Sequence, residues 1–217
     1  VHAHLEPNAA ELTFQGRETI DIVVQRETAS IVLNSLDLDV SDATLDDGTK
    51  AEVTLDVAAQ TLTLALKDPI APGPHRLALA FSGRIGTNPA GLFAVDYSTD
   101  DGPRRMLSMQ LEPADGRRVA PMWDEPAAKA TFTLEVIVPK DLVAFSNMPE
   151  AANRVVGDAR HGGFQPPPWP WGNTRWPFLS YSFWQAMLPP PVPLGSSAQN
   201  TPHFPSLLPA RTRAGSA

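Results

Sequence analysis

The sequence Leu12-Thr-Phe-Gln-Gly-Arg-Glu-Thr-Ile-Asp-Ile-Val-Val24 alternates apolar and polar residues over most of its length. A period of two is typical of a β-strand with one buried face, because successive side chains of a strand point to opposite faces of a sheet. Asp46-Asp47-Gly48 predicts a tight turn, and the two segments that follow it predict a hairpin. Strands are predicted at residues 12–24, 30–34, 36–40, 51–57, 60–66, 76–82, 91–97, 106–111 and 131–138.

Glycine, proline and aspartate separate these short segments, with Pro69 to Pro74 marking a loop. Helical spacing of apolar residues is scarce; only Ala127-Ala128-Lys129 could make a single turn. Many short strands between such turns are typical of two packed sheets. We therefore predict an all-β fold, a β-sandwich or a two-layer, saddle-like arrangement of antiparallel sheets.

Composition excludes several classes of function. The formal net charge of −7 over 217 residues argues against a nucleic-acid surface. No apolar stretch approaches the ~20 residues of a membrane-spanning helix. The absence of cysteine excludes disulfides and thiolate metal sites but does not identify a compartment. Because the chain begins at Val1, we expect a processed product or a fragment.

The composition changes abruptly along the chain. Residues 1–150 carry 12 Lys and Arg against 23 Asp and Glu, whereas residues 151–217 carry 5 against 1 and hold 12 of the 23 prolines. We therefore expect a β domain over residues 1–150 and a disordered, Pro- and Trp-rich tail over residues 151–217. A frameshifted or mis-assembled continuation, an authentic low-complexity tail and a proline-rich ligand for an SH3-like partner all remain open, and translating the underlying DNA in every frame would separate them.

A dense charged motif lies between two predicted strands. It runs from Gln110-Leu111-Glu112-Pro113 through Arg117-Arg118 to Trp123-Asp124-Glu125-Pro126. The motif resembles the N-terminal domain of the aminopeptidase N (alanyl aminopeptidase) family of zinc metallopeptidases, where the pattern reads roughly T-Q-x-E-P-x-D-A-R-R-x-x-P-x-x-D-E-P. Met109 stands where that family usually has Thr, and Gly116 where it has Ala. Weaker matches occur at residues 14–22, 31–34, 36–38 and 146–149.

The resemblance implies a role for Glu112. In the family, the acidic or amide residue at this position reaches from the β domain into the catalytic cleft and binds the substrate's free α-amine. That amine has a pKa near ~8, so it is mostly cationic at neutral pH and suits a carboxylate partner. Gln110 is expected to support the loop, and Pro113 to fix its direction.

The remaining motif residues are expected to build structure. Opposite charges at this density usually form a salt-bridged loop, and Trp123 is expected to pack that loop onto a sheet. The alternative is that some of these side chains contact substrate directly. The structural set consists of Pro113, Asp115, Arg117, Arg118, Asp124, Glu125 and Pro126.

Metal-binding residues of the family are missing from the sequence. Its zinc is held by a helical His-Glu-x-x-His and a later Glu, but the histidines here, at 2, 4, 75, 161 and 203, include no pair four apart. His2-Ala3-His4 could share one face of a strand, yet reads better as an exposed polar pair at a frayed terminus.

We thus predict a fragment of a zinc-dependent aminopeptidase, with zinc in the parent enzyme and no cofactor in this chain. Its expected partners are a peptide N-terminus and the missing catalytic domain, and the chain alone is expected to be inactive. The alternative function is a non-catalytic β-sandwich interaction module.

Overall fold

The computed structural model describes residues 1–46, 48–125 and 127–166, in which every element longer than one turn is a strand. The strands are β1 (His2–Asn8), β2 (Thr13–Val24), β3 (Thr28–Asn34), β4 (Leu38–Leu45), β5 (Thr49–Lys50), β6 (Glu52–Asp56), β7 (Thr61–Ile70), β8 (Gly73–Arg84), β9 (Gly91–Thr99), β10 (Gly102–Gln110), β11 (Thr133–Pro139), β12 (Glu150–Val156) and β13 (Ala159–Phe164). A single 3₁₀ turn, η1 (Gly116–Arg118), follows β10. The predicted all-β fold is confirmed.

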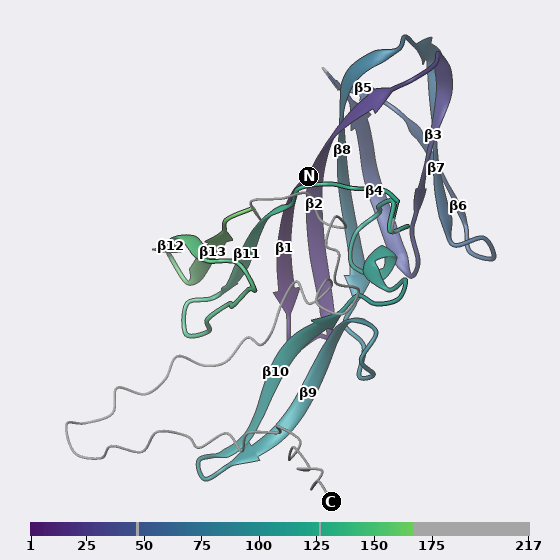
Figure 1. Cartoon of the computed structure of the whole chain (residues 1–217). Helices are drawn as coiled ribbons and strands as arrows, with labels where there is room; N and C mark the ends of the chain where they lie inside the picture. Colours follow the sequence, from purple (N-terminus) through teal and green to yellow (C-terminus); the bar gives the residue numbers. More distant parts are fainter. Residues whose placement is uncertain (47, 126, 167–217) are drawn as a thin grey trace, which may run out of the picture.

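Three sheets make up the domain (Figure 1). The largest has the strand order β12-β13-β11-β1-β2-β8-β4-β5, and a smaller one has the order β3-β7-β6. Strands β9 and β10 pair with each other along their length and form a long hairpin that extends away from the end of the large sheet; an isolated bridge also joins Phe93 of β9 to Gly86. Neighbouring strands are antiparallel except β1 and β11, which run parallel.

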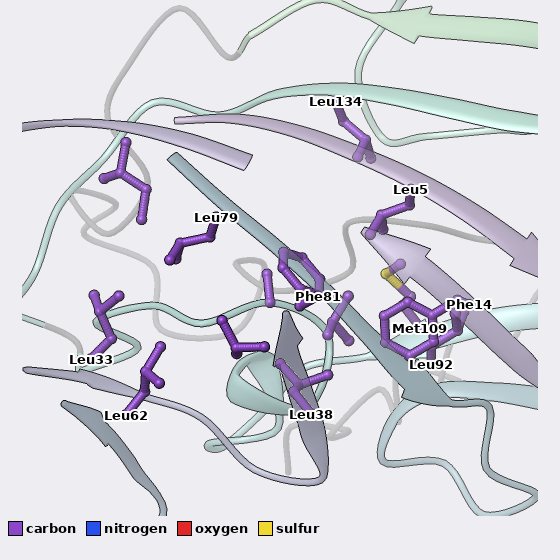
Figure 2. Close-up of a cluster of buried hydrophobic side chains, with 14 of the residues drawn as sticks. Leu5, Phe14, Leu33, Leu38, Leu62, Leu79, Phe81, Leu92, Met109 and Leu134 are labelled. Atoms are coloured by element: carbon purple, nitrogen blue, oxygen red, sulfur yellow. The ribbon is translucent and has the colours of Figure 1, made fainter. Parts of the chain in front are cut away.

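The core lies between the large sheet and the smaller elements. Figure 2 shows Leu33 and Leu62 from the three-stranded sheet facing Leu79 of the large sheet across the buried layer, and all three are at most 3% exposed. Full burial of a leucine side chain contributes about 1.5–3 kcal/mol. Met109 of β10 belongs to the same buried cluster, so the hairpin is attached to the core at its base.

Two glycines in the large sheet make room for aromatic rings. Gly16 pairs with Phe81, and a Cβ built on Gly16 would lie 2.2 Å from the phenyl ring. Gly83 pairs with Phe14 in the same way, with a contact of 2.6 Å. Each ring thus covers the bare backbone of the neighbouring strand, which fixes the register of β2 against β8.

Several strand boundaries differ from the sequence prediction. The residues around His2 and His4 are not frayed, because they form β1 between β2 and β11. The loop predicted from Pro69 to Pro74 shrinks to a short connection, since β7 reaches Ile70 and β8 begins at Gly73. The turn at Asp46 and the hairpin of β6 with β7 are confirmed.

The strand-rich region also extends past residue 150, where the composition change placed the end of the β domain. Strands β12 and β13 form an antiparallel hairpin, and β13 pairs with β11 from Leu134↔Phe164 to Pro139↔Ala159. The part of the predicted tail from residue 167 onward lies outside the described residues. Proline therefore becomes frequent only after β13, the last strand among the described residues, which composition counted from residue 151 could not show.

Glu18 is an exception to the apolar composition of the core. It lies on the inward face of β2, is 3% exposed, and its Oε1 has no hydrogen-bond partner. Burial disfavours the ionised form and raises the pKa of Glu18 to about 8. The folded protein therefore keeps this proton across a pH range in which the unfolded chain, with an ordinary glutamate pKa, has lost it.

We expect this difference to make folding pH-dependent. Between the unfolded pKa and about 8 the folded state binds more protons, so raising the pH lowers the free energy of unfolding, by up to roughly 1.4 kcal/mol per pH unit. Glu18→Gln removes the ionisation and should flatten this dependence, as measured by urea unfolding at pH 5 to 8.5. Asp42→Asn, at an exposed position of β4, is the control. An unchanged pH dependence in Glu18→Gln would contradict the assignment.

Candidate functional site

The charged motif begins where the β9–β10 hairpin meets the core. Strand β10 ends at Gln110, which is half-buried and pairs with Gly91, and the next residue, Leu111, is buried. Glu112 and Pro113 then turn outward and are exposed, and the peptide bond between them is cis. The Asp115 N–H donates to the Leu111 carbonyl at 2.9 Å and closes this turn. Glu112 therefore lies at the surface, two residues after the paired end of β10.

The 3₁₀ turn η1 lies against the start of β9. Gly91 has φ +65°, and a Cβ there would lie 2.9 Å from Cβ of Arg118, so glycine allows the two segments to approach closely. Gly116 is equally confined, because its Cβ would lie 2.9 Å from Sδ of Met122. Alanine, which the resembling family has at this position, would require Met122 to move.

Arg117 and Asp124 form the best-shielded ion pair of the motif. The Arg117 Nε donates to Asp124 Oδ2 at 2.9 Å and its Nη2 donates to Oδ1 at 2.7 Å, a two-pronged geometry that suits guanidinium and carboxylate. The two side chains are 16% and 8% exposed. The hydrogen bonds to Asp124 raise the pKa of Arg117 above its usual value. Arg117 Nη1 also donates to Gln60 Oε1 at 3.1 Å, which ties the loop to the start of β7.

Arg118 pairs with two other carboxylates. Its Nε donates to Asp115 Oδ1 at 2.8 Å, and its Nη1 donates to Asp37 in the connection between β3 and β4. The arginine is 34% exposed, so water screens these pairs more than the Arg117 pair.

Asn34, at the end of β3, joins the motif, although the sequence placed it only in a predicted strand and in one of the weaker family matches. Its Nδ2 donates to Asp124 Oδ1 at 2.7 Å and to Glu125 Oε1 at 3.0 Å. Its backbone exchanges two hydrogen bonds with Met122, at 2.8 and 3.0 Å. The sequence offered two signals, a polar residue at the end of an apolar strand and the family match at residues 31–34, and neither identifies the partner of Asn34.

The structure therefore brings most of the predicted motif into one cluster. Asp115, Arg117, Arg118, Asp124 and Glu125 take part in its hydrogen bonds and ion pairs. Glu112 and Pro113 lie in the exposed turn next to them in the sequence. Trp123 was expected to pack onto a sheet, and its side chain is 39% exposed. Pro126 lies outside the described residues.

Metal-binding side chains do not converge in this cluster. Across residues 1–46, 48–125 and 127–166, no group of three or more His, Cys, Asp or Glu is arranged to hold a metal ion. His4 of β1 and His161 of β13 approach the same carboxylate, that of Glu135 on the intervening strand β11. Their Nδ1 atoms lie 3.4 and 3.1 Å from its oxygens. The described residues thus do not fit the family's zinc.

Comparison with known proteins identifies the fold's lineage. The sequence profile described as the peptidase M1 N-terminal domain matches residues 2–166. The chain belongs to this family. The match ends within three residues of the end of β13, so the M1 N-terminal domain and the described strands cover nearly the same residues.

Relatives of the M1 family show how much of a longer protein the chain corresponds to. Aminopeptidase N of Acetobacter pasteurianus is 45% identical over 139 residues, which are 64% of this chain and 39% of that protein. Aminopeptidase 2 of Candida albicans is 37% identical over 67% of this chain and 16% of its own length. Aminopeptidase M1 of Arabidopsis thaliana is 36% identical over 76% of this chain and 20% of its own length. The chain thus spans well under half the length of these relatives.

In the described part of the chain, no helix is long and apolar enough to cross a membrane.

The ion pair of Arg117 with Asp124 gives a direct test of what stabilises the charged motif. Arg117→Lys keeps the charge but removes the two-pronged bond to Asp124 and the contact with Gln60, so we expect a loss of about 1–3 kcal/mol in unfolding free energy. Arg118→Lys, at a more exposed pair, is the matched control and should cost about 1 kcal/mol or less. Urea unfolding followed by far-ultraviolet circular dichroism measures both. Equal losses would mean that burial does not distinguish the two arginines.

Proposed function

We propose that this chain supplies the substrate-recognition domain of a zinc-dependent aminopeptidase, with Glu112 binding the free α-amine of the peptide. Membership of the M1 N-terminal domain family carries this proposal. Relatives named aminopeptidases, from a bacterium, a yeast and a plant, support it. The described residues do not fit a zinc site, so the metal would be held by the remainder of a longer protein, where it would supply a nucleophilic water.

The position of Glu112 suits recognition of an amine. Its side chain is exposed on a turn that follows a paired strand and precedes a cluster of ion pairs, so its backbone is held at both ends. A carboxylate and an ammonium ~4 Å apart attract each other by about 1 kcal/mol in water and about 4 kcal/mol near a protein surface. Peptide bonds inside a chain lack this cation and would gain nothing, which gives selectivity for a free N-terminus.

Gln110 has a supporting role in this proposal. It is the last residue of β10 and is half-buried, so its backbone is fixed by the pairing with Gly91. Pro113 restricts the backbone immediately after Glu112. Together they limit the volume that the Glu112 carboxylate can reach, which favours binding because less conformational entropy is lost when the amine arrives.

The proposed domain also docks onto the remainder of the protein. Several large apolar side chains are exposed on the described surface, in a chain that corresponds to 16–39% of its relatives. Part of this surface would be covered by the catalytic domain. The exposed apolar residues are Val23, Val32, Leu55, Val57, Trp123, Phe145, Val155 and Val156.

The decisive experiment uses a full-length aminopeptidase that carries this domain. Glu112→Gln removes the negative charge and nearly preserves the shape, so we expect KM for peptides with a free N-terminus to rise by roughly 10-fold or more, as about 1.4 kcal/mol corresponds to tenfold. Asp101→Asn, at the far end of the β9–β10 hairpin, is the control.

Two results would contradict this proposal. Unchanged KM in Glu112→Gln would remove Glu112 from substrate binding. A full-length protein without a zinc site or peptidase activity would instead favour a non-catalytic interaction module.

A further inference from the structure

Asn34 makes an unusual pair of contacts for a buried side chain. It is 9% exposed, and its single amide nitrogen donates to two different carboxylates, Asp124 at 2.7 Å and Glu125 at 3.0 Å. A side-chain amide carries two N–H donors and no charge. Asn34 therefore uses its full donor capacity to hold two adjacent acidic residues at the end of the charged loop.

The chemistry of this position favours an amide over other side chains. Arg117 already supplies the cation that pairs with Asp124, and a second buried cation would itself require desolvation. An aspartate would place a third carboxylate against two others, whereas an alanine would leave the shielded Asp124 oxygen one donor short. Asparagine satisfies both carboxylates without adding charge.

The same segment holds the loop through its backbone. Asn34 exchanges two hydrogen bonds with Met122, and the Leu36 N–H donates to the Arg117 carbonyl at 2.9 Å. The connection between β3 and β4 thus contacts the loop through main chain as well as side chain. This connection joins β3 of the three-stranded sheet to β4 of the large sheet.

These contacts reach the turn that carries Glu112. Arg118 bonds both Asp37, in the same connection, and Asp115. The Asp115 N–H in turn closes the turn onto Leu111, with Glu112 and Pro113 inside it. A displacement of the loop at Asn34 would therefore be passed toward Glu112 through these hydrogen bonds and the covalent backbone that joins them.

We infer that Asn34 is a positioning residue for Glu112: it fixes the place of the amine-binding carboxylate without touching substrate. This inference rests on the proposed function, because the position of Glu112 matters for the reaction only if Glu112 meets the substrate amine. It adds to that function a residue distant in sequence, on β3, whose chemistry is hydrogen-bond donation.

The first test measures amide hydrogen exchange in this chain. Asn34→Ala should speed exchange across residues 111–125 by roughly tenfold or more while leaving β2 and β8 close to their original rates. Unchanged exchange at residues 111–125, or an equal increase throughout the sheets, would overturn the positioning role.

A second variant separates hydrogen bonding from general damage. Asn34→Asp is nearly isosteric, and its carboxyl faces Asp124 and Glu125, so it should take up a proton more readily than an exposed aspartate and then donate one hydrogen bond. Protection of residues 111–125 should be partly restored at pH 5 and lost at pH 8, because the folded state binds the additional proton. Asn153→Asp, where Nδ2 donates to Glu150 in exposed strand β12, is the matched control and should leave the loop unchanged. A loss of protection at residues 111–125 that is the same at pH 5 and pH 8 would overturn the role of Asn34 as a hydrogen-bond donor.

The third test uses kinetics in a full-length aminopeptidase carrying this domain. Asn34→Ala should raise KM, and Asn34→Ala combined with Glu112→Gln should be no worse than Glu112→Gln alone, because both act through one carboxylate. Multiplying effects would overturn the coupling between Asn34 and Glu112. An unchanged KM in Glu112→Gln would overturn the proposed function, and with it the substrate-binding role, whereas the exchange experiment judges the positioning of the loop by itself.

Discussion

The carboxylate of Asp124 is the point on which the charged loop depends. Its side chain is 8% exposed and accepts hydrogen bonds from Arg117, in its own loop, and from Asn34, at the end of β3. A shielded carboxylate is stable only when its lone pairs are occupied, because the desolvation of an unpaired charge costs several kcal/mol. The pairing of Arg117 with Asp124 within the loop and the docking of Asp124 on Asn34 of the three-stranded sheet must therefore form at the same time. This joint requirement gives a segment without regular strands a defined position.

Strand periodicity predicted the part of the fold that local patterns control. The alternation at residues 12–24 agrees with β2, whose inward face carries Phe14, Gly16, Glu18 and Ile20. Residues His2–Asn8 alternate polar and apolar as well, but β1 was not predicted, because His2 and His4 were expected to be exposed positions at a frayed terminus. In the structure β1 pairs with the neighbouring strand β2 along its whole length and with the distant strand β11 at His2 to Leu5. The burial of Glu18 was not predicted either, whereas the structure places its carboxyl in the core with Oε1 lacking a hydrogen-bond partner.

The charged motif shows a similar division. Its density of opposite charges predicted an ion-paired loop, and Arg117 and Arg118 do pair with aspartates that lie nearby in sequence, Asp124 and Asp115. The contacts with Asn34, Asp37 and Gln60 could not be predicted, because they span 57 to 91 positions and depend on where the small sheet packs. The sequence pattern therefore predicted which residues form the loop, whereas long-range packing determines which residues outside the loop they contact.

The distribution of charge within this loop bears on what it can attract. Residues 111–125 contain four acidic side chains and two arginines, and both arginines are already paired with aspartates. The net charge of this segment is therefore negative. A charged ligand would feel it once the ligand comes within about one Debye length, ~8 Å at physiological salt. Such a field favours a cation over an anion whatever its finer geometry. An acidic turn at the end of a core-anchored hairpin agrees with the proposed binding of an ammonium group, and a backbone held on both sides of Glu112 would restrict that attraction to one position of the charge.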